Sequence, residues 1–422
     1  MANWRNWSGS VHAAPSRMFR PRTGDELSLA VREAARVRVT GAGHSFMPLC
    51  ETDGLLLQLG ELEGAIELCA DGVSAWVPAG WPIHKLTPAL WELGFSLFNQ
   101  GDIDRQVIAG ALSTGTHGTG AGLGSLSTQA LGYRLMGPNG DIVECDGETR
   151  GELFQAQRLS LGALGVAVAV RLALAPAYRL RETTRPMSLD EALEAWPELA
   201  AQNRHVEFFV FPYAETALLK ILEPVDAGDD RPASVWLESA ALQVVSDLAR
   251  LAPGLAPSLQ RLLTRAITPA SRAAPAHRIF PSDRPTRFEE MEYEIPAAAG
   301  PAALRAAIAE VRRRGFPIIF PFEFRQVAAD DIWLSPMQGR GCVSISFHQY
   351  APMDWREPFA AIERVFADHG GRPHWAKRHT LGAADVLRLY PDAGRWGETR
   401  RAADPQAKFL NEHLRELFAF SL

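Results

Sequence analysis

The stretch Arg38-Val39-Thr40-Gly41-Ala42-Gly43-His44-Ser45-Phe46 is the part of the chain from which the fold is best predicted. A β-branched run ends in two closely spaced glycines, and a histidine and a serine follow at once. A glycine-rich turn after a strand exposes consecutive backbone N–H groups that can bind a phosphate. Gly41 and Gly43 also let a ligand approach the backbone closely. Taken alone, the pattern is explained more readily by an ordinary strand-to-helix turn with a polar loop histidine.

A second glycine-rich segment, Asn99–Gly120, carries five glycines together with serine, threonine and histidine side chains. Few flexible linkers combine these residue types in this order. We therefore predict a second loop that binds phosphate and ring groups, formed by Gly101, Gly110, Ser113, Gly115, Thr116, His117 and Gly118. A ligand long enough to need two such loops is a dinucleotide.

The first turn is an incomplete dinucleotide fingerprint of the Rossmann type. The pattern G-x-G-x-x-G needs a third glycine where Phe46 stands. Glu61 and Glu63 lie at about the distance expected for a ribose-binding acid, so this alternative stays open. Predicted hairpins around the turn, in place of regular βαβ units, count against it.

Composition and charge indicate a soluble globular protein. The chain has 422 residues, 47% of them hydrophobic and 22% charged, which predicts two domains. A formal net charge of −6 argues against nucleic-acid binding. Four widely spaced cysteines indicate neither a disulfide framework nor a zinc site, and no metal is predicted. Because we find no signal peptide and no apolar run long enough to span a membrane, we expect a cytoplasmic protein without direct membrane insertion.

The first 175 residues mix short helices with hairpins, an α+β pattern rather than a doubly wound sheet. A capping-box sequence, Thr23–Glu26, precedes a helical apolar pattern. Hairpin turns are predicted at Asp71-Gly72 and at Asn139-Gly140. Alternating apolar residues over 166–174 predict a half-buried strand. We therefore predict a first domain over residues 1–175.

The remainder predicts a second α+β domain over residues 176–381, with longer strands of antiparallel type. We expect strands at 206–211, 217–222, 317–327 and 343–350, and helices at 301–314 and 356–369. The Ala/Leu-rich stretch 238–265 contains two prolines and charged residues, so we predict a soluble helical segment there. The last stretch, Pro405–Leu422, is predicted to be an amphipathic helix.

Three segments together resemble the FAD domain of the vanillyl-alcohol oxidase flavoprotein superfamily. They are the first turn, the second glycine-rich segment and Ser160-Leu-Gly162-Ala-Leu-Gly165-Val166. The resemblance implies that FAD lies with its pyrophosphate across the first two loops, while the third segment borders the adenosine half. Besides the second loop, the implied cofactor contacts are Thr40, Gly41, Ala42, Gly43, His44, Ser45, Gly162, Gly165 and Val166. It also implies that a C-terminal segment, about 382–422, returns to the FAD domain.

The second domain narrows the resemblance to the sugar-lactone and alditol oxidase branch, which includes L-gulonolactone oxidase, D-arabinono-1,4-lactone oxidase and alditol oxidase. The segments that carry it are Pro321–Pro336, Arg372–His379 and the start, Trp4–Gly9. In that branch the histidine after Gly-x-Gly is bonded covalently to the flavin, which implies a covalent bond at His44. The implied reaction oxidises a CH–OH group of a polyol or an aldono-1,4-lactone, with O₂ as acceptor and H₂O₂ as product.

Glu323 and Arg325 share one face of a predicted strand. They form either a structural ion pair or an anchor for a polar substrate. In the implied reaction, Arg325 and Lys377 stabilise negative charge that develops on a substrate oxygen, and Glu323 orients the hydroxyl or receives its proton. His348 is a further catalytic candidate, although a core histidine explains its position equally well.

Asp102 and His374 are predicted to contact the substrate, and relatives in this branch often have serine where Asp102 stands. Gly101 occupies the position at which the superfamily places a small residue that controls access of oxygen to the reduced flavin. This favours an oxidase. Two alternatives remain: a dehydrogenase that uses a quinone or a cytochrome, and a flavin-binding protein in which Glu323 and Arg325 are only structural.

Overall fold

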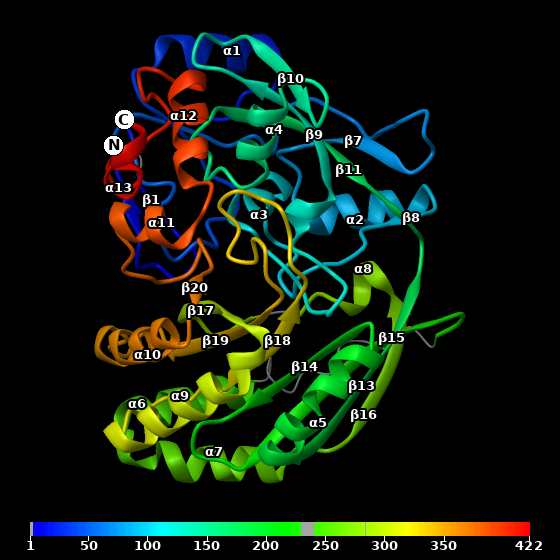
Figure 1. The fold of residues 1–422 in the computed structure, drawn as a ribbon, viewed down its shortest axis with the longest axis vertical. Coiled ribbons are helices and arrows are strands. Elements are labelled where there is room, and N and C mark those ends of the chain that lie inside the picture. Colours follow the sequence, from blue (N-terminus) through cyan, green and yellow to red (C-terminus); the bar gives the residue numbers. More distant parts are fainter. Residues whose placement is uncertain (1–2, 229–239, 283) are drawn as a thin grey trace.

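The structure is a computed structural model that describes residues 3–228, 240–282 and 284–422. The chain forms two bodies stacked along its longest axis, and both termini belong to the upper one (Figure 1). We call the upper body, residues 3–176 and 383–422, the first body, and the lower one, residues 179–373, the second body. Among the described residues, no helix has both the length and the apolarity needed to cross a bilayer.

A five-stranded antiparallel sheet forms the centre of the first body. Its strand order is β10 (Ile142–Asp146), β9 (Ala130–Met136), β11 (Val166–Ala173), β7 (Ser74–Pro78) and β6 (Glu67–Leu68). The hairpins predicted at Asp71-Gly72 and Asn139-Gly140 join β6 to β7 and β9 to β10, and both predictions are confirmed. Gly72 and Gly140 have positive φ, which a tight hairpin turn requires.

A small parallel sheet leads into the first glycine turn. Its strand order is β3 (Arg17–Phe19), β5 (Leu55–Leu57) and β4 (Val37–Val39). Helix α1 (Gly24–Glu33) precedes β4, and its predicted cap is confirmed because the Thr23 hydroxyl accepts the N–H of Glu26 at 3.2 Å. The glycine turn therefore lies at the carboxyl end of β4, where strand pairing stops.

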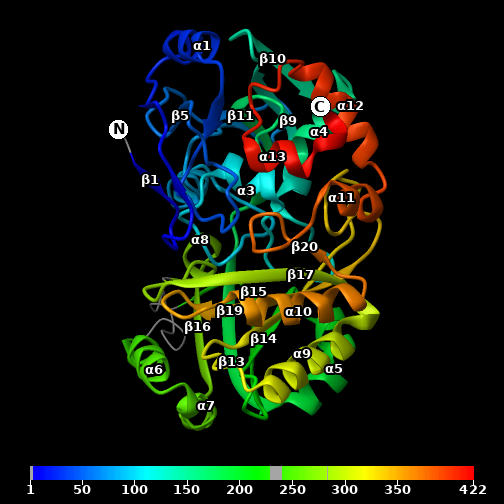
Figure 2. The ribbon, with the colours of Figure 1, turned by 90° about the vertical axis from the view of Figure 1, so that its left-hand side faces the viewer.

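The chain returns to the first body at its C-terminal end. Tyr390, Trp396 and Phe418 share one buried core with Leu86 and Leu135, far away in the sequence. Figures 1 and 2 show the C-terminal helices beside the elements of the first half of the chain. The boundaries at residues 175 and 382 stay predictions. The remaining elements of this body are α2 (Ile83–Glu92), α3 (Ile108–Thr114), α4 (Gly151–Arg158), α11 (Ala383–Leu389), α12 (Ala393–Ala403), α13 (Glu412–Leu417) and the strand pairs β1 (Trp4–Arg5) with β2 (His12–Ala13) and β8 (Phe95–Ser96) with β12 (Ala175–Pro176).

The last stretch differs from the helix predicted over Pro405–Leu422. Residues 405–411 are not helical, and α13 begins only after its cap, Asn411. Tertiary contacts explain the difference, because Lys408 donates from Nζ to two backbone carbonyls of the first body, each at 2.9 Å. The prediction was wrong for this part, since apolar periodicity carries no information about such contacts.

An eight-stranded antiparallel sheet forms the second body. Its strand order is β16 (Ala270–Pro275), β13 (Arg179–Ser188), β15 (Thr216–Val225), β14 (His205–Val210), β18 (Phe322–Val327), β19 (Cys342–Tyr350), β17 (Phe288–Pro296) and β20 (Arg372–Pro373). The antiparallel type and the predicted strands are confirmed, except that the strand predicted from residue 317 begins only at Phe322. Strands β13, β16 and β17 were not predicted.

The two faces of this sheet have different chemistry. Helices α5 (Leu189–Gln202), α9 (Gly300–Arg314) and α10 (Arg356–Asp368) cover one face, where Phe322 and Phe324 are part of the core. Because successive side chains of a strand alternate, Glu323 and Arg325 point to the opposite face. That face meets the first body, and it carries buried charged and hydroxyl side chains from β14, β17, β18 and β19.

Two helices occupy the outer end of the second body. Helices α6 (Ala240–Leu251) and α7 (Ala256–Arg265), joined by the short 3₁₀ turn Pro253–Leu255, lie far from the first body (Figures 1 and 2). They confirm the helical segment predicted over 238–265 for its described part, and residues 238–239 lie outside that part. Helix α8 (Ala276–Ile279) lies close to the junction between the bodies (Figure 1).

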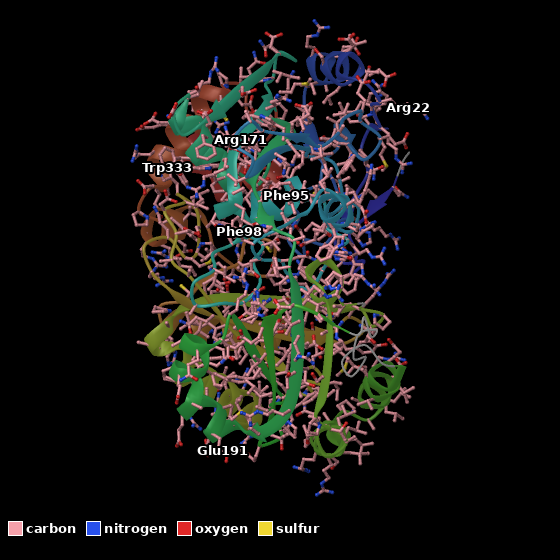
Figure 3. The ribbon with its side chains drawn as sticks, turned by 90° about the vertical axis from the view of Figure 1, so that its right-hand side faces the viewer. Arg22, Phe95, Phe98, Arg171, Glu191 and Trp333 are labelled. Carbon is pink, nitrogen blue, oxygen red and sulfur yellow. The ribbon has the colours of Figure 1, made fainter. Side chains whose placement is uncertain are left out.

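Side chains at the junction connect the two bodies. Phe98 lies there in Figure 3, and its carbonyl accepts hydrogen bonds from Arg204 at 2.8 Å and from the Tyr178 hydroxyl at 3.3 Å. Trp333, also visible in Figure 3, follows β18 in the sequence but packs into the core of the first body. Arg395 of α12 lies over its ring, 4.6 Å from the centroid.

Candidate active site

A cavity of about 490 Å³ lies in the first body, between the glycine turns. We call it the glycine-lined cavity. Its walls come from segments around residues 38–50, 105–114 and 157–167, which are distant in sequence. Ten of the predicted cofactor contacts line it: Thr40, Gly41, Ala42, Gly43, His44, Ser45, Gly110, Ser113, Gly162 and Gly165.

The N-terminal segment holds the first glycine turn in place. The backbone N–H of Trp7 donates to the carbonyl of Gly43 at 2.8 Å, and the Asn6 amide donates to the carbonyl of Ser45 at 3.0 Å. Gly43 has a φ of +69°, and a Cβ there would approach the Trp4 ring to 3.1 Å. Glycine is therefore required for both the backbone conformation and the close packing.

Arg38 joins three segments beneath the cavity, and sequence reasoning did not assign it a role. Its guanidinium donates to the carbonyls of Leu49, Leu161, Gly162 and Phe409 at 2.5 to 3.0 Å. Burial lowers the pKa of Arg38 to about 10, so the side chain stays charged at neutral pH. It thereby fixes the third predicted loop and the C-terminal segment against the first turn.

His44 lies at the edge of this cavity with an uncharged ring at neutral pH. Its ring stacks on Trp7 with centroids 5.5 Å apart. Burial, and after it the charge of the nearby Lys377, lowers the pKa of His44 to about 4. The imidazole therefore keeps a nitrogen lone pair at neutral pH, which bonding to a carbon atom requires.

The residues of the glycine-lined cavity fit an FAD molecule. A Cβ at Gly41 would lie 2.7 Å from the Val107 side chain, so any larger residue there would intrude on this wall. The buried Oε1 of Gln157 lacks a hydrogen-bond partner in the described structure, and Gln157 lines the cavity. A cavity lined by backbone atoms, with a buried polar atom that has no hydrogen-bond partner in the described structure, is suited to a ligand that has both phosphate and ring groups.

A second, smaller cavity of about 80 Å³ lies between the first body and the charged face of the sheet. We call it the polar cavity. All six residues predicted for catalysis or substrate binding line it: Asp102, Glu323, Arg325, His348, His374 and Lys377. Gly101, Thr116 and His117, which were predicted to bind the cofactor, line this cavity and not the glycine-lined one.

Strand β17 supplies a row of three buried glutamates to this region. Glu290, Glu292 and Glu294 are two residues apart, so they share one face of the strand. Lys377 pairs with Glu290 at 2.5 Å, and Arg325 pairs with Glu292 at 2.6 Å. Buried carboxylates are stable only when they are paired in this way.

Glu292 has the most partners of this row. Besides Arg325, it accepts from the Ser344 hydroxyl at 2.6 Å and from His117 Nε2 at 3.0 Å, and Lys377 Nζ lies 3.8 Å away. Although burial alone would raise the pKa of Glu292, the charges of Arg325 and His117 hold it well below its usual range. One carboxylate thus positions both of the cations predicted to act in the reaction.

His117 is charged at neutral pH. Its Nε2 lies 3.0 Å from Glu292 and 3.2 Å from Glu294, and its Nδ1 lies 2.8 Å from the carbonyl of Gly118. Burial alone would lower the pKa of His117, but Glu294 and Glu292 raise it to about 10. This histidine of the glycine-rich segment therefore connects the first body to β17 as a buried cation.

Glu323 and Arg325 keep polar atoms available in the polar cavity. Glu323 Oε2 lies 3.5 Å from Arg325, whereas the buried Glu323 Oε1 and Arg325 Nε have no hydrogen-bond partner in the described structure. Burying a carboxylate oxygen without a partner is costly. Two such atoms on one face of β18 fit a hydroxyl-bearing ligand that would complete their hydrogen bonds.

The remaining predicted residues form the walls of the polar cavity. His374 Nδ1 accepts the N–H of Ala376 at 3.1 Å, and burial lowers the pKa of His374 to about 3, so this ring is neutral. His348 Nε2 lies 3.5 Å from Glu290, and its ring packs edge-on against Phe288. His348 therefore lines the cavity and also packs against an aromatic side chain. This position is compatible with both interpretations of the sequence, a catalytic candidate and a core histidine.

Asp102 belongs to an ion pair that joins the two bodies. Its carboxylate lies 3.1 Å from Arg284 of the second body. Burial alone would raise the pKa of Asp102, but Lys220 and Arg284 lower it below its usual range. Asp102 is thus a charged residue in the wall of the polar cavity.

The two cavities meet at Gln106, which lines both. The backbone N–H of Phe46, beside His44, donates to the carbonyl of Ala376, beside Lys377, at 2.7 Å. This bond ties the loop of the glycine-lined cavity to the loop of the polar cavity. A ring held at His44 would therefore lie close to Lys377, whose charge acts on the His44 imidazole and whose Nζ lies over the Phe46 ring.

Three predicted cofactor contacts line neither cavity. Gly115 ends α3 with a φ of +75°, and a Cβ at Gly118 would lie 2.4 Å from the carbonyl of Gln100. Val166 is buried in the core beside the third loop. These residues have clear structural roles in shaping the loops.

Sequence reasoning missed the β17 glutamates, Arg284 and Gln106. The alternation Glu290-Met-Glu292-Tyr-Glu294-Ile was the available signal, since charged and apolar residues alternate with a period of two. That pattern normally indicates a strand with one face in water. Here the charged face is buried against the first body, which only the packing of the two bodies reveals.

Comparison with known proteins agrees with this geometry. Residues 170–417 match the family model described as D-arabinono-1,4-lactone oxidase, and residues 15–146 match that of an FAD binding domain. An L-gulono-1,4-lactone dehydrogenase of Mycobacterium tuberculosis is 37% identical over 98% of both chains. An L-gulonolactone oxidase of Bos taurus is 28% identical over 98% of both chains.

Solved structures share the fold. A solvent-stable cholesterol oxidase superposes with a TM-score of 0.85 over 100% of this chain and 97% of its own, at 16% identity. A cholesterol oxidase from Brevibacterium sterolicum gives a TM-score of 0.83 over 99% and 96%. At this identity the likeness concerns the fold alone.

The fold and the two cavities define the class, an FAD-dependent oxidoreductase with the two-domain fold of the vanillyl-alcohol oxidase superfamily. The predicted resemblance to the sugar-lactone oxidase branch is confirmed. Within that class, the chain belongs to the D-arabinono-1,4-lactone oxidase family.

Proposed function

We propose that this protein oxidises a CH–OH group of an aldono-1,4-lactone or a polyol, with the reacting carbon held in the polar cavity beside the flavin. The observation that carries the proposal is the pair of unpartnered buried atoms, Glu323 Oε1 and Arg325 Nε, in a cavity that adjoins the glycine-lined one. A sugar hydroxyl is both a donor and an acceptor, so it can satisfy both atoms at once.

In this reaction, the side chains of the polar cavity would have different roles. Arg325 and Lys377 would stabilise negative charge on the substrate oxygen as its proton departs. Glu323 would orient the hydroxyl through Oε1 or receive its proton, because that atom has no hydrogen-bond partner among the described residues. Asp102 and His374 would bind neighbouring oxygens of the substrate, and His348 would support the wall on the Glu290 side.

Bound FAD supplies the hydride acceptor, which no amino-acid side chain can provide. We propose that His44 holds it through a covalent bond, since its imidazole is uncharged and lies at the rim of the cavity. Gly101 lines the polar cavity, and a Cβ there would lie 3.0 Å from the carbonyl of His117. What supports an oxidase that releases H₂O₂ is the small residue that Gly101 provides where the superfamily controls access of oxygen; the close approach of the His117 carbonyl also requires a small residue there.

A dehydrogenase that passes electrons to another acceptor is the second candidate. It is favoured by the name of the 37% identical relative, L-gulono-1,4-lactone dehydrogenase. The two candidates share the substrate class and the reductive step, and they differ only in how the reduced flavin is reoxidised.

One experiment separates these possibilities. The purified flavoprotein is mixed anaerobically with 1,4-lactones, xylitol or sorbitol, and the bleaching of the flavin is recorded before air or cytochrome c is admitted. We expect bleaching by a lactone or polyol and rapid recovery in air. Recovery only with cytochrome c would establish the dehydrogenase, and the absence of bleaching by every compound would refute the sugar chemistry.

The covalent bond has its own test. Acid-precipitated wild-type protein should remain yellow, whereas the precipitate of His44→Ala should release its flavin to the supernatant. A colourless wild-type precipitate would refute the bond without affecting the proposed reaction.

A further inference from the structure

Glu207 is a buried carboxylate next to the polar cavity that lines neither of the two cavities. Strands β13, β15, β14 and β18 follow one another in the eight-stranded sheet (Figure 1). Glu207 of β14 lies opposite Arg325 of β18 in the strand register. Its carboxylate pairs with Lys220 of β15 at 2.8 Å. The charged face of the sheet therefore continues beyond the residues that line the polar cavity.

Three carboxylates from separate parts of the chain come together at this point, and we call them the carboxylate cluster. Asp102, Glu207 and Glu323 each place one oxygen within 4.8 Å of an oxygen of the other two. Glu323 Oε1 is buried and has no hydrogen-bond partner among the described residues, so it is available to accept a proton. Arg325 pairs more closely with Glu292, at 2.6 Å, than with Glu323, at 3.5 Å. Carboxylates that lie this close and share their cations favour a proton bound among them.

Within the carboxylate cluster, Glu207 is suited to hold a proton near neutral pH. Burial raises the pKa of Glu207, and although Lys220 opposes this rise, the charges of Asp102 and Glu323 add to it and bring the pKa to about 7. The nearby His205 is neutral, because burial lowers its pKa to about 4. The titratable and charged groups that face Glu207 are Lys220 of β15, Glu323 and Arg325 of β18, Asp102 of the glycine-rich segment and His205 of β14 itself.

A third cavity, of about 120 Å³, adjoins this cluster. We call it the side cavity. Asp102 and Arg284 line both the side cavity and the polar cavity, and Lys220 also lines the side cavity. Thr268 belongs to its wall and is exposed, so the side cavity reaches the surface. A cavity of this size with charged and hydroxyl walls has room and hydrogen-bond partners for several water molecules.

We propose that Glu207 and Asp102 remove the proton that the substrate hydroxyl gives to Glu323 and pass it to water in the side cavity. We call this path the proton relay, and it rests on the proposed function, in the form in which Glu323 receives that proton. As the carbon is oxidised, the C–H hydrogen leaves with its electron pair for the flavin, and the O–H hydrogen leaves as a proton. The proton moves to Glu323, then within the carboxylate cluster, and finally from Asp102 to solvent.

Glu207 acts through Glu323 and is therefore a positioning residue. When Glu207 is ionised, the carboxylate cluster can take up the proton of the substrate. When Glu207 is already protonated, the cluster must bind a second proton with less negative charge to attract it, so the transfer slows. The rate of flavin reduction should therefore follow the ionisation of Glu207, which a purely structural carboxylate would not cause.

A divalent cation is the less suitable occupant of the carboxylate cluster. Each carboxylate already has a cation nearby: Lys220 lies 2.8 Å from Glu207, Arg284 lies 3.1 Å from Asp102, and Arg325 lies 3.5 Å from Glu323. A metal ion would have to enter against the repulsion of these three positive charges. A proton needs no such space and neutralises one carboxylate directly.

The first test follows anaerobic flavin reduction in the FAD-loaded full-length protein between about pH 5.5 and pH 9. The substrate is the lactone or polyol that bleaches the wild type fastest. We expect the wild-type rate to fall as the pH drops below about 7, by up to about tenfold per pH unit. In Glu207→Gln this fall should begin at least about one pH unit lower, and the rate at pH 8 should be about tenfold below that of the wild type, because the amide takes up no proton.

Glu289→Gln is the matched control. Glu289 is also buried and also loses a cation partner, Arg378 at 2.8 Å, but it lines none of the three cavities. This variant should keep the wild-type pH profile. A Glu207→Gln profile that coincides with that of the wild type would overturn the proton relay and leave the proposed function intact. If no lactone or polyol bleached the wild type, the proposed function would fail and the relay with it.

Treatment with EDTA tests the competing occupant. The wild-type rate of flavin reduction should be unchanged by EDTA. A loss of this rate that Mg²⁺ or Mn²⁺ restores would assign the carboxylate cluster to a metal ion and overturn the relay.

A second measurement decides the matter if Glu207→Gln does not retain its flavin. Phenol red in weakly buffered solution near pH 8 reports the proton that reaches the solvent, and it is recorded together with the bleaching of the flavin. The two signals should coincide in the wild type, whereas in Asp102→Asn the proton should appear about tenfold more slowly than the bleaching. Weaker substrate binding would delay both signals alike, so it produces no lag between them. Coincident signals in Asp102→Asn would overturn the relay.

Discussion

The glycine-lined cavity and the polar cavity are neighbours, but they are built by opposite means. Backbone and small residues of a few contiguous loops form the first, and ten of its lining residues were predicted. Long charged side chains form the second, and they come from β17, β18 and two loops of separate parts of the chain. Nine residues predicted from the sequence line the polar cavity as well, but the β17 glutamates that pair with its cations were missed. Contiguous segments leave a motif in the sequence, whereas ion pairs across strands do not.

The difference also concerns what each cavity tolerates. The glycine-lined cavity depends on the absence of side-chain atoms, so FAD binding should weaken when a side-chain atom is added. The polar cavity depends on balanced charge, so the rate of flavin reduction should fall when one of its charges is removed. Four changes test this contrast, each directed at one cavity while the other is monitored.

The largest effect is expected for Lys377→Met in the polar cavity. Loss of a cation that stabilises developing negative charge lowers a rate by about 10²- to 10³-fold. We expect flavin reduction to slow by about 10³-fold while the bound flavin content stays unchanged, as measured by anaerobic stopped flow. Arg378→Met is the matched control, since Arg378 pairs with Glu289 of the same strand at 2.8 Å and lines neither cavity. Similar losses in both variants would contradict the assigned role.

Glu292→Gln should lower kcat by up to about 10²-fold, the loss that a misplaced catalytic group can cause. The variant keeps an oxygen for Ser344 but loses the charge that holds Arg325 and Lys377. Glu294→Gln is the control, because Glu294 also pairs with His117 but makes no ion pair with Arg325 within the described structure. If the two variants lost activity equally, the effect would belong to His117 and not to the positioning of Arg325.

Gly41→Ala should affect the glycine-lined cavity alone. The added methyl group meets Val107 at 2.7 Å, and overpacking of this kind costs about 1–3 kcal/mol. In the His44→Ala background, where the proposed covalent bond cannot form, we expect Gly41→Ala to lower FAD affinity of the apoprotein about tenfold, measured by fluorescence titration, with no change in the reduction rate of the flavin that does bind. Gly122→Ala, where an added Cβ meets nothing within 4 Å, should bind FAD normally. Normal FAD binding by Gly41→Ala would show that the Val107 side chain moves to accommodate the added methyl group.

The last prediction concerns the pH dependence of stability, and not activity or cofactor binding. The pKa of His117 is about 10 in the folded protein and near 6.5 when the ring is exposed. A raised folded-state pKa stabilises fully below the unfolded value, and this contribution is lost as pH rises through the folded value. The free energy of unfolding in urea should therefore fall between pH 7 and pH 10, at most by roughly 1.4 kcal/mol per pH unit from this group. His117→Asn should remove that part of the slope, and parallel slopes in the two proteins would disprove a buried charged histidine.

Much of the first body could be predicted because its signals are local. Thr23 caps α1 through a residue three positions away, and Gly72 and Gly140 form tight turns between neighbouring strands. The turn at Gly41 and Gly43 was visible for the same reason. The helix predicted over 405–422 failed where Lys408 is held by carbonyls of distant segments, which no local pattern describes.

By itself, the sequence determined the two-domain α+β class, the glycine loops and the shared face of Glu323 and Arg325, because spacing along a strand or through a turn decides each of them. Only the tertiary structure shows that the eight-stranded sheet, which helices cover on one face, buries its other face against the first body. It also shows that β17 brings three carboxylates to the cations on that buried face. His117, a predicted cofactor contact, is shown to be a buried cation paired with Glu292 and Glu294. The positions of these charged side chains depend on pairing between strands that are distant in the sequence. The register of the sheet sets this pairing, and a local sequence pattern does not reveal it.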